Sequence, residues 1–196
     1  MKALLLIDVQ KDFLRSGALA VHGADAIIPV INHLMPLFNL VIASKDWHPQ
    51  HHVSFQSSTI KGPKKKKWPE HCILNTPGSA FPDDLKEEYI KKVFYKGTLE
   101  AQDSYSAFYI GENLQSTGLE EFLRAHNVDE LYIAGIVLEY CVKSTAEDAL
   151  NKDYKVWLIQ DAIASFSLED KEKILKDLQR RGAFLTQSNK ITYENF

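Results

Sequence analysis

Four of the seven histidines fall within one stretch of the chain, between His48 and His71. In that stretch Asp46, His48 and His52 come directly after an apolar run at 40–44. Carboxylate oxygens and imidazole nitrogens are both good ligands for zinc, manganese and iron(II). The segment therefore indicates a metal site. A polar surface loop that is merely rich in histidine is the alternative, and the spacing alone does not decide between the two.

Three further reactive side chains each follow a segment that predicts a β-strand. Asp8 ends the first apolar run, Lys96 follows the run at 92–95, and Cys141 comes just after the run at 130–136. Ligands of open parallel sheets bind beyond the carboxyl ends of the strands, so we expect these groups at one edge. Taken singly, Asp8 could be a cap, Lys96 a solvated turn residue and Cys141 a packing thiol. Their convergence on one edge favours a functional site.

The chemistry of these groups is that of a cysteine nucleophile. A thiolate is the attacking species, and a nearby ammonium and a helix N-terminus both lower the pKa of a thiol. Lys96 would supply the ammonium, and Asp8 would take the thiol proton and return it to the leaving group. Backbone N–H groups near Val137 and Cys141 would bind an oxyanion. The set predicts an amide or related acyl hydrolase that passes through a thioester.

The rest of the sequence predicts the frame that holds these groups. We expect strands at 3–8, 40–44, 92–95, 130–136, 155–160 and 183–186, and helices at 24–38, 83–89, 118–126, 140–152 and 168–181. Apolar strands that alternate with helices indicate a parallel sheet covered on both faces. The predicted fold class is therefore α/β, with three layers and a parallel sheet of roughly six strands. A long loop at 45–81 is typical of a functional segment.

Composition limits the remaining possibilities. The 196 residues are 45% hydrophobic and 11% aromatic, which suits one globular domain over residues 1–196. A formal net charge of −3 gives no general attraction to nucleic acid or to an anionic membrane. The first apolar run, stopped by Asp8, is too short for a signal peptide. We expect a cytoplasmic protein in which Cys72 and Cys141 are thiols rather than a disulfide.

Several motifs carry a resemblance to a known family. They are LIDVQKDF at 6–13, DWHP at 46–49, HVSF at 52–55, WPEHC at 68–72, KG at 96–97, DSYSAF at 103–108 and the segment 135–149. With these motifs the chain resembles the isochorismatase-like cysteine hydrolases, and within them the nicotinamidase (pyrazinamidase) branch. The Asp–Lys–Cys set marks the superfamily. The D-W-H-P and H-x-S-F motifs, together with W-P-x-H-C, mark the branch.

The resemblance implies a specific reaction. It is the hydrolysis of nicotinamide to nicotinate and ammonia in NAD salvage, through a cysteine thioester, with pyrazinamide also accepted. Asp8, Lys96 and Cys141 would form the catalytic triad. The other implied features are Phe13, Trp68 and Tyr105 against the substrate ring, the backbone of Val137 and Cys141 as the oxyanion hole, and a cis peptide between Ile136 and Val137.

The resemblance also implies one divalent metal ion with water completing its shell. Its ligands would be Asp46, His48, His52 and His71. Zinc is the expected metal, and iron or manganese are the alternatives. His51 stands where the family usually has Asp, and the register favours the next histidine as the ligand. Leu138 and Glu139 also depart from the family pattern, beside the predicted oxyanion hole.

Two other functions compete with this one. A related hydrolase of another small amide would keep the fold, but many such relatives lack the metal cluster. A non-catalytic, metal-stabilised binding module is the second alternative, and the Asp8, Lys96 and Cys141 set argues against it. The expected partner is a small-molecule substrate, nicotinamide, with no nucleic acid and no membrane. A homo-oligomer stays open.

Overall fold

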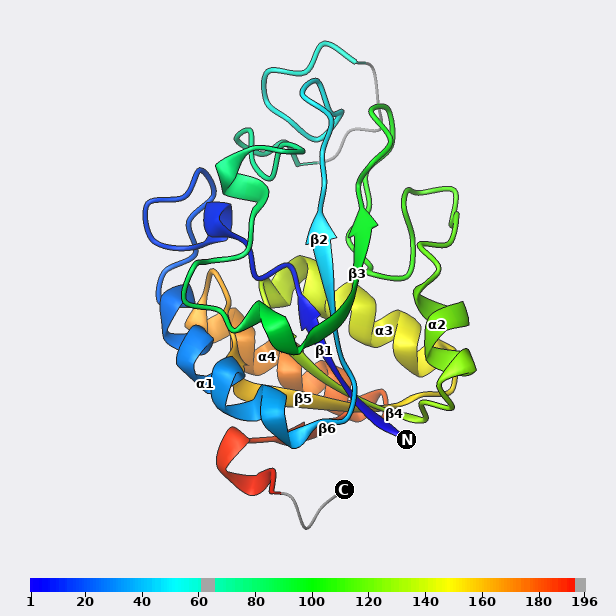
Figure 1. The fold of residues 1–196 in the computed structure, drawn as a ribbon. Helices are drawn as coiled ribbons and strands as arrows, with labels where there is room; N and C mark the ends of the chain where they lie inside the picture. Colours follow the sequence, from blue (N-terminus) through cyan, green and yellow to red (C-terminus); the bar gives the residue numbers. More distant parts are fainter. Residues whose placement is uncertain (61–65, 193–196) are drawn as a thin grey trace.

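The computed structural model describes residues 1–60 and 66–192, and at its centre lies a parallel β-sheet. The described residues form six strands in the order β3-β2-β1-β4-β5-β6, and every neighbouring pair is parallel (Figure 1). The strands are β1 (Lys2–Ile7), β2 (Val41–Asp46), β3 (Ile90–Lys96), β4 (Glu130–Gly135), β5 (Lys155–Ile163) and β6 (Phe184–Thr186). The predicted α/β class with a six-stranded parallel sheet is confirmed.

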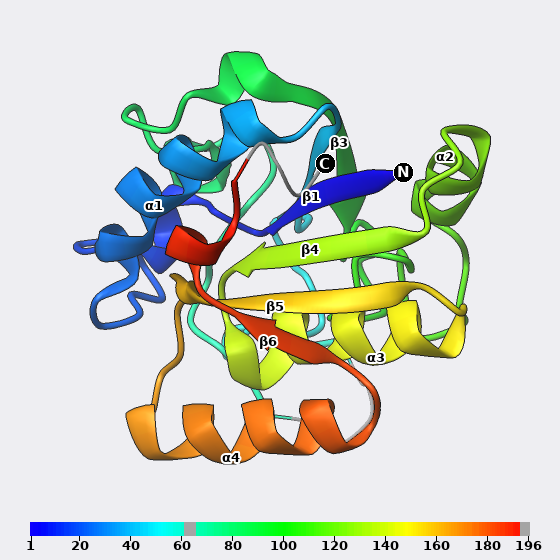
Figure 2. The same ribbon diagram turned by 90° about the horizontal axis from the view of Figure 1, so that it is seen from below.

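Helices cover both faces of this sheet. They are α1 (Ile27–Leu34), α2 (Leu119–Ala125), α3 (Lys143–Asn151) and α4 (Leu168–Arg180). Side chains alternate along a strand, so Leu4 and Leu6 of β1 pack in the core beside α1, whereas Leu5 and Ile7 pack in the core with α3 and α4. Figure 2 shows α1 on one side of the sheet and α3 and α4 on the other. The three predicted layers are therefore present.

Two predicted helices differ from the structure. The stretch 24–38 is divided into a 3₁₀ turn (Ala24–Ala26), α1 and a second 3₁₀ turn (Met35–Leu37). The α-helix ends at Leu34 because Pro36 lacks the N–H that a continued helix needs. The helix predicted at 83–89 is wrong, since only Glu87–Tyr89 forms a single 3₁₀ turn. The side chain of Asn32, in α1, donates to the Asp84 carbonyl and accepts from the Lys86 N–H. These two backbone groups are therefore bonded to α1 instead of to a turn of their own helix.

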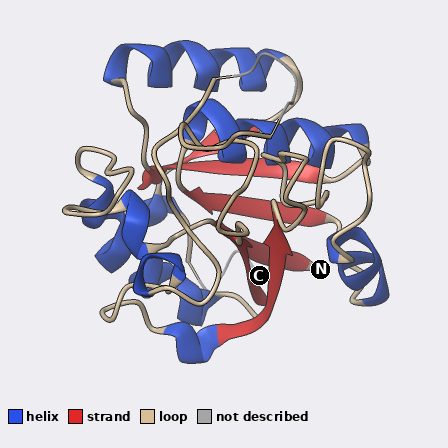
Figure 3. Ribbon diagram, turned by 90° about the horizontal axis from the view of Figure 1, so that it is seen from above, coloured by secondary structure: helices blue, strands red, loops and turns tan. Residues whose placement is uncertain are grey.

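The loops at the carboxyl ends of the strands form the functional edge. The long connection after β2 rises beyond that strand (Figure 1), and seen from above the loops cross over the sheet (Figure 3). The remaining predicted strands and helices agree with the structure to within a few residues, with β5 extended to Ile163. Within the described ranges, no helix combines the length and the apolar character that a membrane crossing requires.

Candidate active site

Three neighbouring strands deliver the candidate groups to one edge. Asp8 follows the last residue of β1, and Asp46 and Lys96 are the last residues of β2 and β3, where they are paired in register. Asp8 has a φ of 49°, in the left-handed region, at the point where the chain leaves the sheet. Cys141 arrives from the turn after β4, which pairs with β1 through Ile7 and Gly135.

Lys96 lies at the centre of this group, and its side chain is fully buried. Its Nζ lies 3.3 Å from Cys141 Sγ and 2.8 Å from Asp8 Oδ2, and it also donates a hydrogen bond to Asp46 Oδ1. Ser44 Oγ donates to Asp8 Oδ1 at 2.7 Å. Asp8 Oδ2 is not aligned for a hydrogen bond with any described residue. The structure thus brings the three residues of the predicted triad together. Asp8 Oδ2 lies on the side of Asp8 that meets Lys96.

The charges of these groups depend on one another. Burial lowers the pKa of Lys96, but Asp46 and Asp8 outweigh it, and the pKa lies well above the ordinary value. Burial raises the pKa of Asp8, against the opposing effect of Lys96. Burial also raises the pKa of the Cys141 thiol well above its ordinary value; Lys96 opposes this shift, and the carboxylates of Asp8 and Asp46 add to it. The resting site therefore holds an ammonium and a protonated thiol.

The turn that carries Cys141 is not an ordinary helix start. The Ile136–Val137 peptide is cis, as the resemblance implied, and a π-helical turn (Leu138–Val142) precedes α3. Such turns are rare in helices and frequent at functional sites. The N–H of Val137 donates to no other residue that the structure describes. Val137 and Cys141 both line the same cavity, so this backbone donor is available beside the sulfur.

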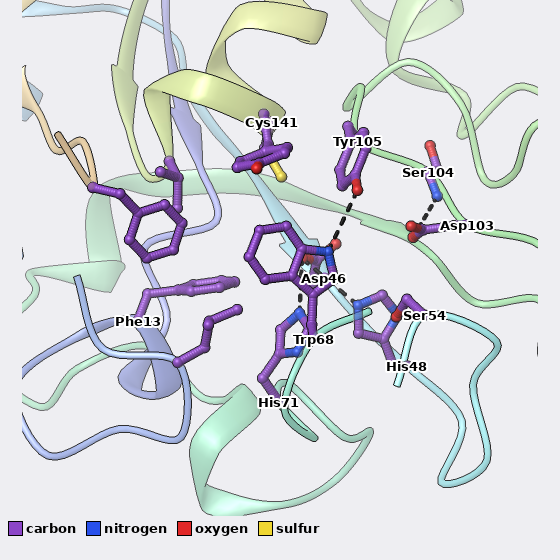
Figure 4. Close-up of a pocket in the computed structure, with 14 residues that line it drawn as sticks. Phe13, Asp46, His48, Ser54, Trp68, His71, Asp103, Ser104, Tyr105 and Cys141 are labelled. Carbon is purple, nitrogen blue, oxygen red and sulfur yellow. Dashed lines mark hydrogen bonds and ion pairs between the residues drawn. The ribbon is translucent and has the colours of Figure 1, made fainter. Parts of the chain in front are cut away.

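Asp46, His48 and His71 form a compact cluster of buried metal-ligating groups. Their ligand atoms all lie within 4.8 Å of one another. The Nε2 atoms of His48 and His71 lie 3.7 and 4.0 Å from Asp46 Oδ2 (Figure 4). Burial alone would raise the pKa of Asp46, but Lys96 and His48 hold it below its usual range. The cluster thus offers an ionised carboxylate and two imidazoles to one point.

The backbone sets the tautomer of both imidazoles. His48 Nδ1 lies 3.0 Å from the Gly97 carbonyl oxygen, and His71 Nδ1 lies 2.7 Å from that of Pro69. A carbonyl oxygen only accepts, so each Nδ1 carries a hydrogen, and each ring in its neutral form has its Nε2 lone pair for a metal. This support is typical of metal-binding histidines. Burial lowers the pKa of His71 to about 4, which keeps it neutral at physiological pH.

Of the four predicted ligands, His52 lies outside this cluster. Its Nε2 lies 2.8 Å from the carbonyl oxygen of Gln102, and its Nδ1 lies 2.7 Å from Ser54 Oγ. The carbonyl fixes a hydrogen on Nε2, so this nitrogen has no lone pair for a metal. The His52 ring instead stacks on His48 with centroids 4.1 Å apart. His51 is exposed and also lies outside the cluster.

A cavity connects the metal cluster to the sulfur. The predicted substrate-binding residues Phe13, Trp68 and Tyr105 all line it (Figure 4). Trp68 Nε1 donates to the Tyr105 hydroxyl at 3.4 Å. The lining also includes residues that the sequence analysis did not assign, namely Leu19, Ser54, Asp103, Ser104, Tyr140 and Phe166. Asp103 and Ser104 belong to the DSYSAF motif, whereas no pattern in the sequence marks Phe166.

Gln10 is a further residue that the sequence analysis did not assign. Its amide is buried and bonds to both backbone groups of Asp46: Oε1 accepts from the N–H at 2.9 Å, and Nε2 donates to the carbonyl at 2.8 Å. The same Nε2 donates to the Ser79 carbonyl at 3.0 Å. Gln10 therefore fixes the end of β2 at the point where its carboxylate meets the metal cluster. Its place in the LIDVQKDF motif is the signal that could have found it.

The parallel sheet, with a buried acid, ammonium and thiol beside a three-ligand metal cluster, defines this chain as an α/β enzyme. A family model described as the isochorismatase domain matches residues 2–190, and the chain belongs to that family. The nicotinamidase of Escherichia coli (strain K12) is 38% identical over 199 aligned residues, which cover 94% of this chain and 93% of the relative. Similarity of this extent to nicotinamidases identifies the chain as an amidohydrolase.

Solved structures of the same family match the whole fold. The nicotinamidase from Acinetobacter baumanii is 34% identical with a TM-score of 0.89, covering 97% of this chain and 98% of its own. The PnC1 protein from L. infantum, solved in complex with nicotinate, is 31% identical, with a TM-score of 0.89 and coverage of 96% and 93%. The pyrazinamidase of Pyrococcus horikoshii, solved with zinc, is 36% identical, with a TM-score of 0.83 and coverage of 95% and 98%.

Proposed function

We propose that this protein hydrolyses nicotinamide to nicotinate and ammonia through a cysteine thioester. One observation carries the proposal: the Lys96 ammonium lies 3.3 Å from Cys141 Sγ and 2.8 Å from Asp8 Oδ2, beside an aromatic cavity that Cys141 lines. The metal cluster lines the same cavity, and its Asp46 offers a carboxylate oxygen within 4.8 Å of the sulfur. The similarity to nicotinamidases supports the choice of substrate.

In the first half of the reaction Asp8 acts as the base. Its Oδ2 takes the Cys141 proton while Sγ attacks the carboxamide carbon, and the raised pKa of Asp8 makes it a better proton acceptor than an ordinary aspartate. The N–H groups of Val137 and Cys141 hold the resulting oxyanion. Asp8 then passes the proton to the amide nitrogen, the C–N bond breaks, and ammonia leaves behind a thioester on Cys141.

In the second half water takes the place of ammonia. Asp8 accepts a proton from the water as its oxygen attacks the thioester carbon, and the same N–H groups hold the second oxyanion. The C–S bond then breaks, nicotinate leaves, and Asp8 returns the proton to the sulfur. Throughout both halves Lys96 stays charged, because Asp46 and Asp8 hold its proton, and it stabilises the sulfur whenever it is a thiolate.

The donor set fits a divalent metal ion. Asp46, His48 and His71 offer one carboxylate oxygen and two Nε2 lone pairs, with both Nδ1 atoms held by carbonyls, a combination that suits zinc, iron(II) or manganese. We propose zinc, which the pyrazinamidase from P. horikoshii was solved with. When bound, the metal would offer a coordination position to the ring nitrogen of the substrate.

The aromatic lining then determines how the substrate lies. Phe13, Trp68 and Tyr105 would contact the ring and turn its carboxamide toward Cys141, which makes the attack effectively intramolecular. Pyrazinamide has a ring of the same size with a nitrogen at the same position, so we propose that it is a second substrate. Nicotinate is the product that NAD salvage consumes, and we place the enzyme in that route.

The direct test is release of ammonia from nicotinamide by the purified, metal-loaded protein. We expect turnover that Cys141→Ala abolishes while the circular dichroism spectrum stays unchanged. Hydroxylamine added during turnover should divert part of the product to nicotinohydroxamate, since it competes with water for a thioester. Turnover by Cys141→Ala near the wild-type rate would overturn the thioester mechanism. A wild type that hydrolyses other amides but not nicotinamide would overturn the substrate.

A further inference from the structure

The loop between β5 and α4 adds an aromatic ring to the cavity. Phe166 lies on this loop at residues 164–167, lines the cavity, and remains 38% exposed. Its ring stacks on Trp68 with centroids 6.1 Å apart and an interplanar angle of 16°. It also meets Tyr140 edge to face at 6.4 Å. The loop thus extends the aromatic wall that Trp68 begins, from a part of the chain far from the metal cluster.

Glu139 holds this ring in place from both sides. Its Oε1 accepts a hydrogen bond from Ser165 Oγ at 2.6 Å and another from the Ser167 N–H at 3.0 Å, and these residues flank Phe166. Glu139 itself lies in the π-helical turn that presents Cys141. The same turn therefore carries both the sulfur and the residue that anchors the loop of Phe166.

The rest of the loop does not depend on Glu139. The backbone of Ala164 bonds to Leu138 N at 2.9 Å and to Gly135 O at 3.0 Å. Farther along, the Ser167 side chain caps α4 by accepting from Asp170 N at 3.2 Å. Because both ends of the loop are fixed in these ways, loss of the Glu139 carboxylate would release only the tip that carries Phe166, and the fold would persist.

The hydrogen bonds that the structure describes for Glu139 go to the loop and not to the backbone beside Cys141. Both go to the loop through Oε1, whereas Oε2 is buried and has no hydrogen-bond partner among the described residues. Among those residues, neither oxygen bonds to the backbone of Val137 or Cys141, where the oxyanion would form. The contacts of this carboxylate are therefore those of an anchor for Ser165 and Ser167.

We infer that Phe166 determines specificity and that Glu139 is the positioning residue that holds it. Phe166 limits the cavity to a flat, unsubstituted six-membered ring, so carboxamides of ring-methylated pyridines are excluded. The inference rests on the proposed function, because the ring is that of nicotinamide. This role would explain why Glu139 departs from the usual family residue. Its carboxylate anchors the loop that carries Phe166, and no sequence motif marks that loop.

The test compares kcat and KM for nicotinamide and for a set of ring-methylated nicotinamides. In Phe166→Ala the KM for nicotinamide should rise roughly 2- to 10-fold, the amount that loss of an aromatic contact gives, with kcat little changed. At least one methylated substrate should gain kcat/KM relative to nicotinamide. Glu139→Ala should repeat this pattern, and the double variant should be no worse than either single one.

Two matched variants separate positioning from other effects. Glu139→Gln keeps an oxygen that accepts from Ser165 and Ser167, so it should restore most of the wild-type KM and discrimination. Leu168→Ala, two residues beyond Phe166, removes an 82% exposed side chain that does not line the cavity, and should change neither. Thermal unfolding should confirm that each variant folds.

Several results would overturn the inference. An unchanged KM and unchanged methyl discrimination in Phe166→Ala would exclude the wall. Additive losses in the double variant, or a rise in KM in Glu139→Gln as large as in Glu139→Ala, would exclude positioning by Glu139. If the wild type did not hydrolyse nicotinamide, the proposed function would fail first. Calorimetry would then measure the affinity of nicotinamide for Cys141→Ala and for the double variant Cys141→Ala, Phe166→Ala. Equal affinities in the two would show that Phe166 does not contact the ligand and would reject the inference.

Discussion

Gly97 and His48 lie so close together that no side chain fits between them. A β-carbon on Gly97 would lie 2.7 Å from His48 Nδ1 and closer still to Cε1, and the φ of Gly97 is +61°. The Gly97 carbonyl also accepts the Nδ1 hydrogen of this ring. Because Lys96 directly precedes Gly97, one dipeptide holds the ammonium beside Cys141 and the imidazole beside Asp46.

Gly97→Ala should therefore damage the metal site before it damages the fold. The added methyl group forces the His48 ring to move, and a ligand whose support is lost typically costs 10- to 100-fold in metal affinity, so we expect about that loss. Titration of the stripped protein with zinc, followed by a competing chelator, would measure it. Gly118→Ala is the control, since its φ is also positive but nothing lies near its β-carbon. Equal zinc affinity in both variants would contradict the expectation.

The two neighbours of Cys141 should shift its pKa in opposite directions. The Asp8 carboxylate raises the pKa of the thiol and Lys96 lowers it. Asp8→Asn should therefore move the pH midpoint of Cys141 alkylation down, and Lys96→Met should move it up. Iodoacetamide labelling across a pH series, with peptide mapping to separate Cys141 from Cys72, would measure both. Shifts in the same direction would contradict this arrangement.

Both of these variants should nevertheless lose turnover. Asp8→Asn removes the proton acceptor although it makes the thiolate easier to form, so kcat should fall roughly 10²- to 10⁴-fold. The loss should not add to that of Cys141→Ala, because groups that act as a unit are not additive. Ammonia release by the single and double variants would show this. A variant with a lower thiol pKa and higher turnover would mean that Asp8 only opposes ionisation.

His52 and His71 should differ sharply in their effect on metal content. His71→Ala removes a ligand and should lower zinc affinity by more than about a hundredfold. His52→Gln keeps a donor toward the Gln102 carbonyl and should leave the metal content of the purified protein close to that of the wild type. Elemental analysis by mass spectrometry would decide. Comparable loss of zinc in the two variants would restore His52 as a ligand.

The ring nitrogen of the substrate should affect kcat/KM more than the shape of the ring does. Benzamide has the same carboxamide and ring shape as nicotinamide but lacks the nitrogen, so it should be a far poorer substrate, whereas pyrazinamide should be accepted. Removal of the metal with a chelator should depress nicotinamide turnover and leave Cys141 open to alkylation. Equal kcat/KM for benzamide and nicotinamide would contradict the orienting role of the metal.

The sequence was sufficient to predict the groups that follow strands. Asp8, Asp46 and Lys96 are adjacent to apolar runs, and the rule that parallel strands end at one edge is enough to bring them together. The same rule placed Cys141 at this edge, and the motifs assigned His71 as a metal ligand. Apart from His71, each of these residues lies in a strand or helix that periodicity predicts, or just after one.

The residues that the structure places differently from the prediction, or that the sequence analysis missed, depend on partners distant in the sequence. The spacing of His52 from Asp46 is that of a ligand, yet the Gln102 carbonyl, from the segment after β3, occupies its Nε2. The helix predicted at 83–89 is replaced by backbone bonds to Asn32. Phe166 was missed because its partner Trp68 lies on another loop. In each case a tertiary contact overrides a local pattern.

The site has a kinetic consequence for folding, because its residues come from separate strands. Asp8, Asp46 and Lys96 lie at the ends of β1, β2 and β3, and Cys141 lies in the turn after β4. None of these pairs is local in sequence, so no single hairpin or helix can form part of the site early in folding. Contacts of such long range make the closing of the sheet slow relative to helix formation. Activity regained during refolding would thus report the pairing of the central strands and lag behind the return of helical circular dichroism.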